Sequence, residues 1–153
     1  MVWLIAIVGG VTTIMFAQDK IRDEARKGAE LQRETEMVDL AVTMSSYVHE
    51  QQKERGASAI FLSSRGSQYR DELLAQRALT DARLQEVRTQ SALVLSQKLD
   101  PLVEKDLRAF LTKSQEIPEI RSQVDSLSIE SGPALGFYTG MKHQVIHLIG
   151  TLS

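Results

Sequence analysis

The sequence contains no cysteine, which excludes disulfides and thiolate metal sites and leaves the redox compartment open. It also lacks a marked excess of either charge, since the net charge is −2 and 42% of the residues are hydrophobic. This composition is that of neither a disordered tail nor a nucleic-acid-binding domain. No stretch alternates apolar and polar residues as a β-strand would. The sequence therefore predicts an all-α protein, and its length suits a single domain with a modest core.

Sequence motifs of enzymatic chemistry are missing as well. Ser58, Ser63 and Ser64 have no convincing base and no nucleophile-elbow motif, and no glycine-rich phosphate loop is present. His143 and His147 are four residues apart and could share a metal, but no glutamate follows the first histidine and no third ligand is evident. We interpret them as partly exposed helix histidines. No catalytic activity, metal or cofactor is expected in this segment.

One long uncharged run, Val2 to Ala17, opens the chain. A membrane-spanning helix needs roughly 17 to 25 residues, so this run is slightly short. Because it is apolar on every face, we predict a transmembrane helix over residues 1–18 that lacks a few residues at its front. A signal peptide is the main alternative, although the basic region that would precede it is missing.

The remaining sequence, residues 19–153, is helical in its periodicity almost everywhere. A long first helix is expected over residues 19–62, ended by the turn formers of "SSRGS", and a second over residues 69–99. A third should begin at Pro101 and be kinked or broken at Pro118, and a fourth should begin at Pro133.

Short connections between four amphipathic helices predict an antiparallel up-down four-helix bundle with an extended first helix. The sequence is still helical and apolar at Ser153, so we expect a cut before a second membrane span, with an output domain beyond it.

Three arginines fall on predicted inward stripes of three helices. Arg55 lies seven residues after Val48 and seven before Leu62, whereas Arg77 and Arg121 continue apolar stripes in the second and third helices. An unpartnered buried charge is costly, so each arginine needs an anion. Internal salt bridges are one explanation, with Asp81 one turn after Arg77 and Glu54 beside Arg55. The other is a shared pocket for a small oxyanion, whose planar oxygens suit the guanidinium fork.

Four segments carry a family resemblance: "HEQQKERGASAIFLSS", "LLAQRALTDARL", "IPEIRSQVDS" and "ALGFYTGMKHQVIHLI". Together they resemble the landmarks of the nitrate- and nitrite-sensing (NIT) domain, over roughly residues 37–152. The resemblance implies a helical input module of bacterial signalling proteins such as chemoreceptors, histidine kinases and cyclases, usually outside the inner membrane between two spans. A minority of members are soluble regulators.

The same resemblance implies ligand-binding residues. Arg55 matches the arginine of the family's "ER" element, Arg121 matches the late arginine in "IR", and Arg77 matches the "R--TD" position. Some members carry two adjacent arginines in the first helix, where this chain has Lys53-Glu54-Arg55.

We therefore predict a periplasmic, ligand-sensing domain of a transmembrane receptor in the bacterial inner membrane. It would bind nitrate or nitrite through Arg55, Arg77 and Arg121 and pass a helix displacement to an output domain. A homodimer is expected, and no nucleic acid partner. The alternatives are a structural four-helix coupler or dimerisation stalk, and a module that binds a protein partner.

Overall fold

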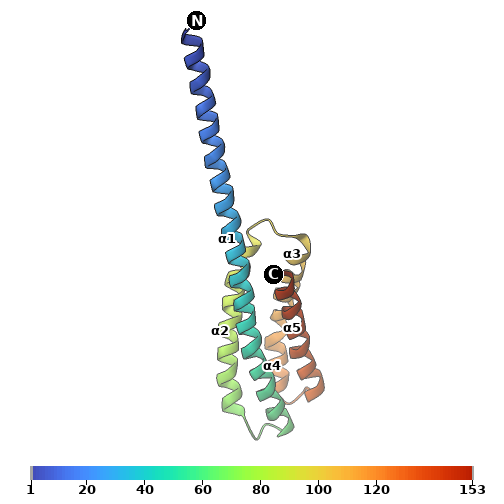
Figure 1. The fold of residues 1–153 in the computed structure, drawn as a ribbon. Coiled ribbons are helices and arrows are strands. Elements are labelled where there is room, and N and C mark those ends of the chain that lie inside the picture. The colour runs from blue at the N-terminus through green and yellow to red at the C-terminus, as the bar shows by residue number, and fades with distance from the viewer. Residues whose placement is uncertain (1, 153) are drawn as a thin grey trace. The chain divides into compact units, whose positions relative to one another are not determined.

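The computed structural model describes the backbone of residues 2–152 and the side chains of residues 18–152. Within this part of the chain all regular structure is helical, which confirms the predicted all-α class (Figure 1). The elements are α1 (Val2–Ser63), α2 (Arg70–Leu95), α3 (Pro101–Lys113), a 3₁₀ turn η1 (Ser114–Glu116), α4 (Ile117–Asp125) and α5 (Ser131–Leu152). The chain divides into two units, residues 1–35 and residues 36–153.

The first unit is the beginning of α1, and its side chains from residue 18 onward are exposed. Local ion pairs line this stretch, among them Lys27 with Asp23 at 2.8 Å. The predicted membrane-spanning segment, residues 1–18, lies almost entirely outside the residues whose side chains are described. Within the described residues, no helix combines the length and the apolarity that crossing a bilayer requires.

In the second unit, the helix ends follow from local sequence. Asp100 precedes α3 and its Oδ1 accepts a hydrogen bond from the backbone N–H of Leu102 at 2.8 Å, while Pro101 occupies the first turn. The chain tightens into η1 just before α4, which has Pro118 in its own first turn. The predicted break at this proline is confirmed, since its ring cannot fit the interior of a continuous helix.

The end of α1 is a Schellman motif. Arg65 takes a left-handed conformation (φ 54°), and the N–H groups of Arg65 and Gly66 donate to the carbonyls of Leu62 and Phe61. Gly66 also has a positive φ of 79°, and a Cβ there would lie 3.4 Å from the Phe61 ring. The predicted turn at "SSRGS" is thus confirmed.

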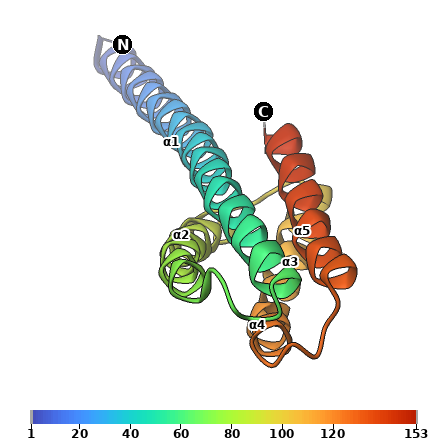
Figure 2. The same cartoon turned by 90° about the horizontal axis from the view of Figure 1, so that it is seen from below.

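The second unit is a bundle. In it, α2, the consecutive helices α3 and α4, and α5 lie alongside the part of α1 that belongs to this unit (Figures 1 and 2). Glu36 of α1 accepts a hydrogen bond from Gln97 after α2, while Glu50 accepts one from Gln76 near the start of α2. These two pairs show that α1 and α2 run in opposite directions.

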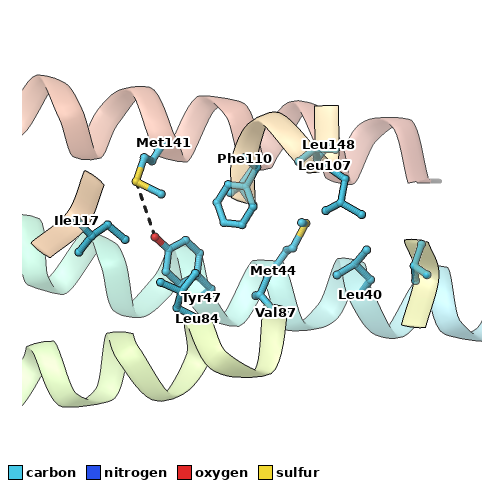
Figure 3. Close-up of a cluster of buried hydrophobic side chains, with 12 residues drawn as sticks. Leu40, Met44, Tyr47, Leu84, Val87, Leu107, Phe110, Ile117, Met141 and Leu148 are labelled. Atoms are coloured by element: carbon cyan, nitrogen blue, oxygen red, sulfur yellow. Dashed lines mark hydrogen bonds between the residues drawn. The ribbon is translucent and has the colours of Figure 1, made fainter. Parts of the chain in front are cut away.

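The core centres on Tyr47 of α1 (Figure 3). Its ring packs edge-on against Phe110 of α3, with centroids 5.8 Å apart, and its hydroxyl lies 4.0 Å from the Met141 sulfur of α5. Burying each such side chain contributes about 1.5–3 kcal/mol. The same cluster contains further buried residues of α1, α2, α3, α4 and α5: Leu40, Met44, Leu84, Val87, Val94, Leu107, Ile117, Val145 and Leu148.

The buried stripe of α1 differs from the predicted one. Its members recur every four and three residues: Leu40, Met44, Tyr47, Gln51, Glu54, Ser58 and Phe61. Arg55 lies beside this stripe and is half-buried, so its predicted place on the inward stripe is wrong. Two apolar side chains of α1, Leu31 and Val38, lie outside this stripe and are exposed. In α2, by contrast, the predicted inward stripe that includes Arg77 is buried throughout.

Candidate functional site

A carboxylate lies at the centre of the bundle, where Glu54 of α1 is fully buried. Arg121 of α4 donates from Nε to Oε1 and from Nη2 to Oε2, both at 2.8 Å. The Tyr138 hydroxyl of α5 donates to Oε1 at 2.9 Å. This carboxylate therefore joins three helices through charge-assisted hydrogen bonds, which are the strong ones in a desolvated interior.

Arg121 is saturated on its other side as well. Its Nη1 donates to the two carboxylate oxygens of Asp81 on α2, at 2.7 and 3.0 Å. Burial alone would lower the pKa of Arg121, but the hydrogen bonds donated to Glu54 and Asp81, together with their charges, raise it above its ordinary value. The guanidinium is thus held firmly in its charged form.

Arg77 of α2 is less well satisfied. Its Nη1 donates to both oxygens of Asp125, at 2.9 Å each, and its Nε lies 4.0 Å from Glu54 Oε1, too far for a hydrogen bond. Among the described residues, the buried Nε and Nη2 of Arg77 find no acceptor. Leaving such donors unsatisfied costs about 1–3 kcal/mol or more for a charged group, so the site favours an additional acceptor.

Arg55 has a similar deficit at one atom. Its Nε is buried and has no hydrogen-bond acceptor within the described part of the chain, and none of the ion pairs found there involves it. The side chain as a whole is half-buried, at the edge of the core stripe of α1.

Of the three predicted arginines, the structure brings Arg77 and Arg121 together around Glu54. Arg55 follows Glu54 in the chain but does not pair with that carboxylate. The expected internal partners are also redistributed, because Asp81 pairs with Arg121 and not with Arg77.

Three features of the site were not predicted from the sequence: the hydrogen bond of Tyr138 to Glu54, the pairing of Asp125 with Arg77, and the central place of Glu54. For Glu54 a signal exists, since the four-and-three spacing from Leu40 to Phe61 passes through it.

The charges of the cluster do not balance. Two guanidinium groups, of Arg77 and Arg121, face three carboxylates, of Glu54, Asp81 and Asp125. These five groups carry one net negative charge, which equals in size the positive charge of Arg55, the residue that follows Glu54 in the chain. Asp81 and Asp125 are about half exposed, so water screens them more than it screens Glu54.

Two tyrosines border the cluster and stay protonated. Burial and then the negative charge of Glu54 raise the pKa of Tyr47 and of Tyr138 well above the ordinary value. Tyr138 can therefore act as a neutral donor toward an oxyanion or a carboxylate at the centre of the bundle.

The two histidines of α5 lie elsewhere. His147 Nε2 is 3.4 Å from Asp106 Oδ2 on α3, and its side chain is largely exposed. Among the described residues, no group of three potential metal ligands occurs.

Comparison with known proteins identifies relatives. The family model NIT, described as nitrate and nitrite sensing, matches residues 46–153. The solved structure of the NasR transcription antiterminator is similar, with a TM-score of 0.77 and 24% sequence identity over 84% of this chain. The similarity covers 35% of the NasR chain, so this chain corresponds to about a third of that protein. No curated protein matches the chain.

Proposed function

The chain belongs to the nitrate and nitrite sensing (NIT) family, and we propose that it is a sensor module that binds a small planar oxyanion, with nitrate and nitrite as candidates. One observation supports the location. Arg77 Nε, Arg77 Nη2 and Arg55 Nε are buried and have no acceptor in the part of the chain that the structure describes. A planar oxyanion would supply acceptors to such donors in pairs.

The proposed ligand-binding residues are Arg55, Arg77 and Arg121. Arg77 offers two N–H groups without an acceptor among the described residues. Arg121 donates from Nε to Glu54 Oε1, the oxygen that Arg77 Nε faces at 4.0 Å. Arg55 would supply the positive charge that the cluster lacks. Tyr138 adds a neutral donor at that oxygen. Because the family is one of sensing, the output of binding would be conformational.

We further propose the setting in which that output is used. The domain would be the extracytoplasmic part of a bacterial inner-membrane receptor, anchored by the uncharged run over Val2–Ala17 and acting as a homodimer. The bundle would be antiparallel and up-down throughout, and ligand would displace α1 relative to α5 and so inform an output domain. A ligand shifts such an equilibrium only by its differential affinity for the two states.

The test is ligand-dependent stability of the 153-residue chain in mild detergent. Sodium nitrate or nitrite should raise the melting temperature, with sodium chloride at equal ionic strength as the reference. At 100 times the dissociation constant, binding adds about 2.7 kcal/mol, which is a shift of several degrees. Arg77→Lys and Arg55→Ala should each lose the shift, because the free buried donors or the balancing charge are removed.

Arg83→Ala is the matched control. Arg83 is another α2 arginine, but it is exposed and, within the described residues, its ion pair is with Glu86 at 2.8 Å, so its loss should leave the nitrate shift intact. Absence of any shift in the wild type with both anions would refute the proposal.

A structural coupler is the second candidate, and the saturation of Arg121 by Glu54 and Asp81 favours it. In that case the arginines only tie the four helices together. Arg77→Lys would then lower the melting temperature equally in nitrate and in chloride.

A further inference from the structure

The Glu54 carboxylate is bound in the way a free planar anion would be. Its two oxygens, Oε1 and Oε2, accept parallel hydrogen bonds from Nε and Nη2 of Arg121, each at 2.8 Å. We call this pair of donors the Arg121 fork. The Oε1 position is also approached by the Tyr138 hydroxyl at 2.9 Å and by Arg77 Nε at 4.0 Å. Two donors, from α4 and α5, thus bond to one oxygen of α1, and Arg77 Nε of α2 faces the same oxygen from beyond hydrogen-bond distance.

The electrostatics of the cluster oppose an added anion while Glu54 stays in place. Its two arginines and three carboxylates already carry one net negative charge, and Glu54 is fully buried. A second anion next to this carboxylate would be repelled by a like charge in a desolvated interior, where water screens the charges little. While Glu54 accepts hydrogen bonds from Nε and Nη2 of Arg121, a ligand therefore has no access to these two donors.

We infer that Glu54 is an internal competitor of the ligand: its carboxylate occupies the Arg121 fork in the ligand-free protein, and an oxyanion binds by taking that place. This inference rests on the proposed function and names the event that would couple binding to movement. Because Glu54 belongs to α1 and Arg121 to α4, expulsion of the carboxylate releases α1 from α4. An anion oxygen at the former Oε1 position would face Arg121, Tyr138 and Arg77.

The fold should tolerate removal of the competitor. Without Glu54, Arg121 still pairs with Asp81 and Arg77 still pairs with Asp125. Neither guanidinium is then left buried without a counter-charge, which is the situation that makes loss of one ion-pair partner severe.

The first arm of the test is nitrate and nitrite titration by calorimetry of the 153-residue wild type, Glu54→Gln and Asp81→Asn. If the Glu54 carboxylate occupies the Arg121 fork in about nine-tenths of the molecules, only about one-tenth can bind the anion. Glu54→Gln, which removes the competing charge, should then lower the apparent dissociation constant for nitrate about tenfold. Asp81→Asn is the matched control. Asp81 also pairs with Arg121, but through Nη1, and so it does not occupy the Nε and Nη2 fork. This substitution should change affinity much less. Affinity in Glu54→Gln equal to or weaker than that of the wild type would overturn the inference.

The second arm uses formate, which carries the carboxylate that is removed, on Glu54→Ala. Formate should raise the melting temperature of this variant, or restore its helical circular dichroism if it is unfolded in chloride. Its effect on the wild type should be smaller, because Glu54 still competes for the position there. If neither the wild type nor Glu54→Gln binds nitrate or nitrite, the proposed function fails, and formate alone decides whether Glu54 fills an anion position. No response of Glu54→Ala to formate would then overturn that assignment.

Discussion

The Glu54 carboxylate and the Arg121 guanidinium meet edge to edge, with both hydrogen bonds at 2.8 Å, and so connect α1 with α4 at the centre of the bundle. The carboxylate is fully buried and the arginine side chain is 13% exposed, so the pair is held away from water. Such a pair is costly to desolvate and still costlier to break, and it ties the position of α1 to that of α4.

Arg121→Ala should destabilise the domain by about 3 kcal/mol, because among the described residues it leaves the buried Glu54 with Arg77, at 4.0 Å, as its counter-charge. Adding Glu54→Gln should recover part of that loss, since no charge then remains unpaired at this point. Guanidinium chloride unfolding followed by circular dichroism measures both. Arg108→Ala, which removes an exposed pair with Glu104, should cost no more than about 0.5 kcal/mol. An Arg121→Ala loss as small as this would contradict the prediction.

Stability should fall at alkaline pH. Burial, with the charge of Glu54, raises the pKa of Tyr47 and Tyr138 in the folded state. Above about pH 10 the unfolded chain releases these phenolic protons while the folded protein keeps them, so the stability they contribute is fully present below pH 10 and is lost progressively above it. Urea unfolding at pH 8 to 11 measures the slope. It should become shallower in Tyr138→Phe, and an unchanged slope would argue against this origin.

Phe110→Ala should cost about 3–5 kcal/mol, because the ring is fully buried and packs edge-on against Tyr47. Leu102→Ala in the same helix is the control, since Leu102 is 53% exposed and its truncation removes little buried surface. Chemical denaturation of the two variants side by side would test this. Equal losses would mean that the core lies elsewhere than the cluster around Tyr47.

Ligand should change the spacing of α1 and α5. The chain has no cysteine, so Ser45→Cys and His143→Cys, at exposed positions of the two helices, can be spin-labelled selectively. We expect nitrate to move the mean label distance by roughly 1–2 Å, the usual size of a helix shift in switching. Double electron–electron resonance in nitrate and in chloride measures it. A distance distribution identical in both salts would contradict the displacement mechanism.

Much of the fold was readable from local sequence. Pro101, Pro118 and Gly66 act on their own turns, so the break within the third helix and the end of the first were predictable. The inward stripe of α2 was also predictable, because its four-and-three spacing is a property of one helix alone. In α1 the same rule, applied through Leu40 and not through Val48, places Glu54 inside and Arg55 beside it. Adjacent residues differ by about 100° around a helix, so a register shifted by one residue changes the answer.

The sequence by itself determined that the protein is helical, where its helices break and that Arg77 lies on an inward stripe. Only the tertiary structure decided which counter-charges the arginines receive. Arg121 pairs with carboxylates 67 and 40 residues away, while Asp81, the neighbour of Arg77 along α2, pairs across the bundle with Arg121. Partner choice depends on how each helix is rotated about its axis and staggered against the others. That arrangement is set by the packing of the whole core, and no single helix encodes it.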